Sequence, residues 1–169
     1  MIQKTPTAPQ TDKGASHIRA HLLLIEGRFY DDIADMLVEG AVAECGARGV
    51  TFERITVPGA LEIPQVLAAA AEAREAGRAT FDGALALGCV IRGETAHYDI
   101  VCNNANHWLM EVAVRHGVPV GNAILTVDTR DQAIARAEGG ISGKGGDAAR
   151  ACLKLIEVRR AFWGTPHDG

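Results

Sequence analysis

The chain has 169 residues, of which 47% are hydrophobic and 22% charged, and this composition is typical of a folded domain rather than of a disordered chain. Its formal net charge is −4, so it lacks the overall positive charge that nucleic-acid-binding domains carry. The longest apolar stretch, residues 83–91, is too short for a membrane span of about 18 residues, and the N-terminus lacks a signal-peptide core, so we expect a cytoplasmic domain without nucleic-acid or membrane partners.

Short apolar runs alternate with longer amphipathic segments between two polar ends. Residues 1–16 are predicted to form a flexible N-terminal tail, residues 17–163 a single domain, and residues 164–169 a frayed C-terminus. In chain order we predict a strand at 21–25, a helix at 31–48, a strand at 51–57, a helix at 61–76, a strand at 83–90, a helix at 98–116, a strand at 118–125, and helices at 131–137 and 148–162.

This alternation predicts an α/β fold, a three-layer sandwich in which helices cover both faces of a four-stranded parallel sheet. Ligands of such sheets bind outside the carboxyl ends of the strands. The loops at 27–30, 58–62, 89–97 and 126–130 are therefore the candidate binding segments.

The loop at 88–95 carries the glycine spacing of a nucleotide-binding loop, but Glu94 stands where that loop needs lysine. A carboxylate there disfavours nucleotide hydrolysis, whereas Gly93, Glu94 and Thr95 precede a helix whose free N–H groups favour a smaller anion. His97 lies at the start of that helix. Spacing alone leaves it either a catalytic group or a capping, solvated residue.

Other candidate residues also have two interpretations. Glu62 stabilises the first turn of a helix by its charge, or contacts a ligand. Phe29 packs into the core at a strand end, or offers a stacking surface. The glycine-rich segment 138–146 reads as a mobile turn in which Arg136 and Lys144 are solvated cations.

The cysteines and histidines show no metal-ligand spacing. Cys45, Cys89, Cys102 and Cys152 are far apart in the sequence, without a CxxC pair. We expect them to be reduced, buried apolar side chains, and we expect no metal.

Three motifs follow one another along the chain: VPGALEIP at 57–64, LGCVIRGETAH at 87–97, and AIARA at 133–137 followed by GKG at 143–145. Together, and in this order, they resemble the 6,7-dimethyl-8-ribityllumazine synthase family, over about residues 21–162. The resemblance implies a flavodoxin-like sandwich that assembles as homopentamers, with each active site between neighbouring subunits.

The resemblance also implies a reaction without a cofactor. The small-molecule substrates are 5-amino-6-(D-ribitylamino)uracil and 3,4-dihydroxy-2-butanone 4-phosphate, and their condensation gives 6,7-dimethyl-8-ribityllumazine, phosphate and water in the penultimate step of riboflavin biosynthesis. The enzyme is a transferase.

Carried over by position, the resemblance assigns roles to individual residues. Phe29 would stack on the pyrimidine, His97 would shuttle protons, and Arg136 of the adjacent subunit would bind phosphate. The remaining substrate-binding residues are Ala60, Leu61 and Glu62 along the ribityl chain, Cys89, Val90 and Ile91 at the pyrimidine edge, Glu94 and Thr95 at the phosphate, and Asn122 and Lys144.

The sequence departs from the family at several positions. Tyr30 stands where many members have asparagine, Cys89 where many have threonine, and Asn122 where many have phenylalanine. These departures support an alternative function, a non-catalytic flavin- or lumazine-binding module on the same scaffold. A structural shell or carrier protein is a third possibility. Segment 138–142 also differs from the family pattern, so the sequence does not decide whether the pentamers remain free or assemble into a sixty-subunit shell.

Overall fold

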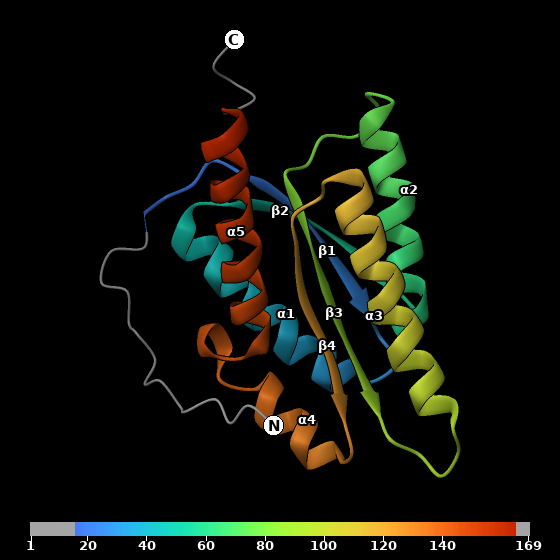
Figure 1. Cartoon of the computed structure of the whole chain (residues 1–169). Helices are drawn as coiled ribbons and strands as arrows, with labels where there is room; N and C mark the ends of the chain where they lie inside the picture. The colour runs from blue at the N-terminus through green and yellow to red at the C-terminus, as the bar shows by residue number, and fades with distance from the viewer. Residues whose placement is uncertain (1–15, 165–169) are drawn as a thin grey trace.

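The computed structural model describes residues 16–164 and places four parallel strands in one sheet, with the order β2-β1-β3-β4 (Figure 1). The predicted tail and the end of the chain therefore lie almost entirely outside the described residues. The strands are β1 (His21–Gly27), β2 (Thr51–Val57), β3 (Gly83–Ile91) and β4 (Val120–Val127). The helices are α1 (Asp31–Arg48), α2 (Ile63–Glu75), α3 (His97–His116), α4 (Arg130–Ala137) and α5 (Lys144–Trp163), with short 3₁₀ turns η1 (Ala60–Glu62) and η2 (Gly140–Ser142).

Helices cover both faces of the sheet, which confirms the predicted three-layer sandwich. Helices α2 and α3 lie on one face, and α1, α4 and α5 lie on the other (Figure 1). Successive side chains of β1 point into different cores: Leu22 and Leu24 pack with α1 and α5, whereas Leu23 packs with α2 and α3. β3 is apolar along its whole length because it is buried on both faces, and β1 is apolar from Leu22 to Ile25 for the same reason.

Glycines end two of the long helices where the sequence predicted. Gly49 follows α1 with φ 69°, and its N–H group donates to main-chain carbonyl groups of the last turn. Gly117 follows α3 in the same left-handed conformation, with φ 61°. A side chain is unfavourable in this region, so both helices stop at these residues.

The last helix begins earlier than the sequence predicted. We expected residues 138–146 to form a turn, but α5 starts at Lys144 rather than at Ala148. Gly145 and Gly146 are buried, and a Cβ atom on Gly145 would overlap the carbonyl oxygen of Leu37. The glycines thus allow α5 to pack closely on α1, a tertiary requirement that helix propensity does not reveal.

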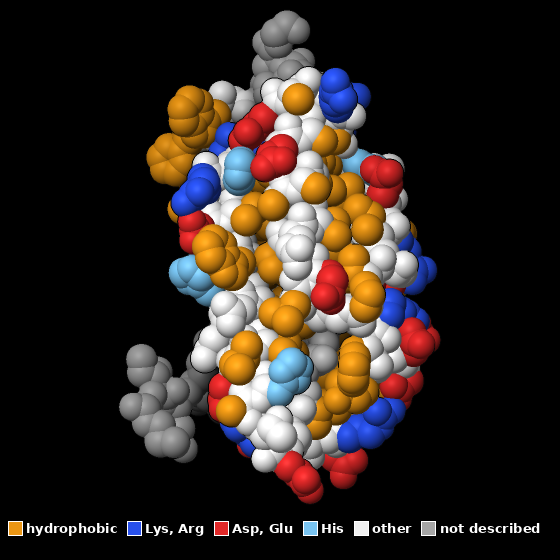
Figure 2. Space-filling view, turned by 90° about the vertical axis from the view of Figure 1, so that its right-hand side faces the viewer, with side chains coloured by type: hydrophobic (Ala, Val, Ile, Leu, Met, Phe, Trp, Pro, Cys, Tyr) orange, Lys and Arg blue, Asp and Glu red, His pale blue; other side chains and the backbone are white. Residues whose placement is uncertain are grey.

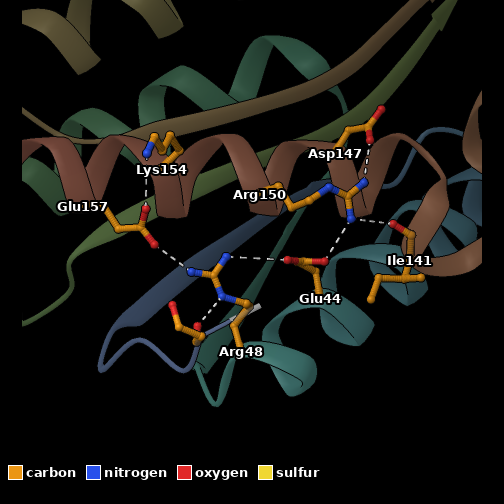
Figure 3. A network of polar contacts seen from close by, with 8 residues as sticks. Glu44, Arg48, Ile141, Asp147, Arg150, Lys154 and Glu157 are labelled. Atoms are coloured by element: carbon orange, nitrogen blue, oxygen red, sulfur yellow. Dashed lines mark hydrogen bonds and ion pairs between the residues drawn. The ribbon is translucent and has the colours of Figure 1, made fainter. Parts of the chain in front are cut away.

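A polar network holds the turn before α5 in place (Figure 3). Glu44 of α1 is buried and accepts a 2.9 Å hydrogen bond from Arg150 of α5. Arg150 also donates to the carbonyl oxygen of Ile141, at 2.9 Å, and to the carboxylate of Asp147, at 2.6 Å. The guanidinium therefore ties η2 to both α1 and α5. Within residues 16–164, no helix is long and apolar enough to cross a membrane.

Candidate functional site

The principal candidate site is a cavity of about 380 Å³ at the carboxyl ends of β1, β2 and β3. Three loops form it: the turn between β1 and α1, the segment that contains η1, and the loop between β3 and α3. Its lining residues are Phe29, Tyr30, Pro58, Gly59, Ala60, Leu61, Glu62, Cys89, Val90, Ile91, Gly93, Thr95, His97, Tyr98 and Val101. The cavity therefore lies at the edge of the sheet where α/β proteins with parallel sheets bind their ligands.

Most of the predicted site residues meet in this cavity although they come from three separate loops. Those that line it are Phe29, Ala60, Leu61, Glu62, Cys89, Val90, Ile91, Thr95 and His97. Tyr98 and Val101 also line the cavity and were not predicted as site residues; they lie about one helical turn apart on α3. Their spacing of three residues places them on one face of that helix, next to His97.

Of the two interpretations of Phe29, the structure supports the exposed ring rather than the core side chain. Its side chain is 74% exposed and lines the cavity, so the alternative of a core phenylalanine is wrong. The ring meets Tyr30 edge-to-face, with centroids 5.0 Å apart. One face of an aromatic side chain is therefore available to a planar ligand.

A buried carboxylate anchors the turn that carries Phe29. Glu26 of β1 is fully buried and accepts hydrogen bonds from Arg54, at 2.6 Å, and from Arg28, at 3.2 Å. Arg28 also donates to Asp31 and Asp35 in the first two turns of α1, at 2.8 and 2.6 Å. This charged cluster was not predicted from the sequence, although a charged residue, Glu26, within an otherwise apolar strand is a signal that could have indicated it.

Glu62 acts locally as a helix cap. One of its carboxylate oxygens accepts a 2.9 Å hydrogen bond from the N–H group of Gly59, three residues earlier. The charge also lies at the start of α2, where the helix dipole favours it. The predicted local role is therefore present, and the same side chain lines the cavity.

The loop between β3 and α3 and the first residue of α3 supply further polar groups to the cavity. The side chain of Thr95 accepts a 3.4 Å hydrogen bond from the N–H group of His97, at the first residue of α3. His97 is exposed at the cavity, and within residues 16–164 its ring has no hydrogen-bond partner. An imidazole in this position is accessible to a ligand.

The four cysteines are free and buried, as predicted. Cys89 lines the cavity, and burial raises the pKa of its thiol to about 11. A thiol with this pKa is protonated at neutral pH, so it is a poor nucleophile. Among residues 16–164, no three His, Cys, Asp or Glu side chains come together in a way that could hold a metal ion.

Four predicted site residues lie outside the cavity. Glu94 is exposed beside it, and Asn122 of β4 donates a 2.7 Å hydrogen bond to Asn106 of α3. Arg136 lies in the last turn of α4 and donates to the carbonyl oxygen of Gln132, whereas Lys144 pairs with Asp147 at 3.3 Å and is not simply a solvated cation. No lysine or arginine is among the residues that line the cavity.

A parallel three-layer α/β domain, with a small-molecule cavity across the carboxyl ends of its strands, is the class that this fold and site define. Comparison with known proteins narrows the class. The sequence model of the 6,7-dimethyl-8-ribityllumazine synthase family matches residues 19–160, and the chain belongs to this family.

Individual relatives agree with the family match. The chain is 49% identical to 6,7-dimethyl-8-ribityllumazine synthase 1 of Rhodopseudomonas palustris, over 94% of each chain. It is 47% identical to the synthase of Nitrobacter hamburgensis, again over 94% of each chain. It is 49% identical to that of Agrobacterium fabrum, over 86% of this chain and 99% of the relative. The resemblance inferred from the motifs is confirmed.

Proposed function

We propose that this protein is a transferase that condenses 5-amino-6-(D-ribitylamino)uracil with 3,4-dihydroxy-2-butanone 4-phosphate to give 6,7-dimethyl-8-ribityllumazine, phosphate and water. The family supports the reaction, and the observation that carries it here is the convergence of the motif residues on one cavity at the strand ends. This is a step of riboflavin biosynthesis, and we expect it to take place in the cytoplasm.

The cavity offers complementary groups for the two substrates. The exposed ring of Phe29 stacks on the pyrimidine, and Ala60, Leu61 and Glu62 border the ribityl chain, where the carboxylate oxygen of Glu62 that does not cap η1 accepts hydroxyl hydrogen bonds. The strand end at Cys89–Ile91 presents main-chain groups to the pyrimidine edge. The hydroxyl of Thr95 and the free N–H groups at the start of α3 bind the phosphate.

His97 is the proton carrier in this proposal. Imine formation, phosphate elimination and ring closure each move protons, and an imidazole both accepts and donates protons near neutral pH. The substrate amine is itself the nucleophile, which agrees with a protonated thiol at Cys89. Holding both substrates side by side supplies a further part of the rate.

The cation that the phosphate needs comes, in our proposal, from a second copy of the chain. No lysine or arginine lines the cavity, and Arg136, Lys144 and Asn122 lie on α4, α5 and β4 and are not among its lining residues. The face formed by α2 and α3 carries gathered apolar side chains (Figure 2). Ile100, Trp108, Met110 and Val114 are exposed apolar side chains of α3, and Trp108 also lines a 450 Å³ groove between α2 and α3. We expect this face to be covered in a homopentamer.

The activity test mixes the purified protein with both substrates and follows lumazine absorbance and phosphate release. We expect the His97→Ala variant to be slower by about 10²–10³-fold, because general acid–base catalysis contributes on this order, while pyrimidine binding is preserved. His17→Ala is the matched control, since His17 is also an exposed histidine but lies before β1, outside the cavity. It should keep full activity.

A different result would support the binding module. The departures at Tyr30 and Cys89 lie in the cavity itself, so they bear directly on the pyrimidine pocket. Tight binding of riboflavin or lumazine, with no product above the uncatalysed background, would refute the synthase proposal and leave this alternative.

Mixed oligomers test whether the site is shared between subunits. His97→Ala and Arg136→Ala chains are each expected to be nearly inactive alone. When they are unfolded and refolded together, about one quarter of the interfaces should pair an intact His97 with an intact Arg136 of the neighbour, so about one quarter of the activity should return. No recovery in the mixed assembly would contradict a shared site, and sedimentation would separate a pentamer from a larger particle.

A further inference from the structure

A second cavity, of about 560 Å³, lies at the opposite end of the sheet from the candidate active site. It is bounded by the segment that leads into β1, the segment before β3, and the C-terminal turns of α2 and α5. These elements meet at the upper end of the molecule in Figure 1. The proposed reaction uses none of the residues that line this cavity.

Positive charge gathers around this cavity although the whole chain has a net charge of −4. The arginines that line it are Arg19, Arg74, Arg159 and Arg160, and Asp82 is the single acidic residue among the lining residues. Asp82 is already engaged, because it accepts a 2.8 Å hydrogen bond from the N–H group of His21 and lies 3.4 Å from Arg160. The local excess of positive charge is therefore not neutralised by the cavity wall.

Most arginines in the described part of the chain have an acidic partner, and three of the four at this cavity are exceptions. Within the described part of the chain, the arginines with no carboxylate oxygen within 4.0 Å are Arg19, Arg74, Arg78, Arg136 and Arg159. Three of them line this one cavity. They come from residues far apart in the sequence, so the fold brings them together.

Arg74 is held in place rather than simply solvated. Its guanidinium lies 4.9 Å from the ring centroid of Phe81 and donates a 3.1 Å hydrogen bond to the carbonyl oxygen of His116. Burial, and secondly the charge of Arg159, lower the pKa of Arg74. An anion between the two guanidinium groups would relieve this repulsion.

Stabilisation of helix ends by positive charge explains only part of this group of arginines. Cations are favourable near the last turn of a helix, and Arg74 donates to the carbonyl oxygen of His116, the last residue of α3. Arg160 instead donates to the carbonyl oxygen of Arg19, at 2.7 Å, in the segment before β1. Arg19 is not in a helix, and its side chain has no partner among residues 16–164. The side chain of Arg159 likewise pairs with no acidic group among them.

We propose that this cavity is a second ligand site and that it binds a small phosphate compound of two or more negative charges, with Arg19, Arg74 and Arg159 as its ligands. Guanidinium groups match phosphate oxygens with paired hydrogen bonds. The concave shape favours a small molecule over an extended polymer. Trp163 stands at the rim with its side chain 81% exposed, and it offers a ring surface to a heterocycle attached to the phosphates.

The test is calorimetric titration of the full chain with inorganic pyrophosphate and, separately, with adenosine diphosphate at constant ionic strength. We expect saturable binding that weakens at least fivefold in Arg159→Gln and in Arg19→Gln. Both side chains are exposed, so the fold should survive, which thermal unfolding checks. Arg78→Gln is the matched control, because Arg78 is exposed and unpaired in the described residues but lies outside the cavity.

The outcomes distinguish this site from the proposed active site. No saturable binding, or equal affinity in Arg159→Gln and Arg78→Gln, would overturn the proposal. Binding lost in Arg136→Gln but retained in Arg159→Gln would overturn it too, because the phosphate would then occupy the active site. If adenosine diphosphate binds more tightly than pyrophosphate, and Trp163→Ala removes this difference, the result would support a ligand in which a ring is attached to the phosphates.

Discussion

Most arginines near the two ends of the sheet are used differently, although Arg136 near the carboxyl ends has no acidic partner among the described residues and Arg160 at the amino ends pairs with Asp82. Near the carboxyl ends, Arg28, Arg54, Arg92 and Arg130 are all paired with carboxylates, and none of them lines the cavity. At the amino ends, Arg19, Arg74 and Arg159 line a cavity and have no acidic partner among the described residues. A paired guanidinium holds loops in place, whereas an unpaired one in a cavity remains available to an anion.

The largest expected effect is on the reactivity of the cysteine thiols, two of which lie at opposite ends of the sheet. Cys89 lies at the carboxyl end, and burial raises its pKa to about 11; Cys152 packs near the amino end, and burial raises its pKa to about 12. Relative to an ordinary thiol with a pKa of 9.0, the thiolate of Cys89 is about 100-fold scarcer at pH 8. An aromatic disulfide reagent should therefore label the folded protein very slowly and the unfolded protein at once.

Rapid labelling of one thiol in the native protein, absent from a Cys89→Ser variant, would contradict this expectation. It would show that the cavity exposes this thiol to the reagent despite its burial in the structure.

Removing a paired arginine should cost more stability than removing an unpaired one. Arg54→Ala leaves the fully buried carboxylate of Glu26 with Arg28 alone. Because breaking a buried ion pair strands a charge, we expect a loss of about 2–3 kcal/mol in the free energy of unfolding, measured by urea titration. Arg159→Ala, at the other end, should change it by less than about 0.5 kcal/mol. Equal losses would remove the contrast between the two ends.

A conservative change at Arg28 should act on substrate binding. Lysine cannot reproduce the fork with which Arg28 contacts Glu26, Asp31 and Asp35, so Arg28→Lys should loosen the turn that carries Phe29. We expect the KM for the pyrimidine to rise about threefold to tenfold with little change in kcat, since the lost interaction is made equally in ground and transition states. Arg115→Lys, at an exposed pair with Glu111, should leave both constants unchanged. An unchanged KM in Arg28→Lys would show that the turn holds Phe29 without this fork.

The smallest expected effect concerns the exposed pair between Asp32 and Arg130, which links α1 to α4. The hydrogen bond from Arg130 lowers the pKa of Asp32 below its ordinary value of 3.8. A lowered folded-state pKa means that the pair stabilises the protein above this value and that the contribution disappears as the pH falls through the folded-state pKa. The stability difference between the wild type and Asp32→Asn should therefore shrink between pH 6 and about pH 3. Asp131→Asn serves as the control, and a constant difference across this range would argue against the pair.

The order and type of the elements followed from the sequence because periodicity is a property of neighbouring residues. The alternation of strands and helices was enough to predict a parallel sheet. Local signals were enough to predict the boundaries of α1 and the end of α3 at Gly117. The motifs at 57–64 and 87–97 likewise indicated residues that meet in one cavity, because parallel strands end at the same edge of a sheet.

Tertiary structure decided what depends on residues far apart in the sequence. The exposure of Phe29, the early start of α5 at its glycines, and the burial of Glu26 each follow from contacts between separate elements. The same holds for the cavity that collects Arg19, Arg74 and Arg159. Local pattern fixes which face of an element is apolar, but burial and charge pairing depend on which other elements that face meets.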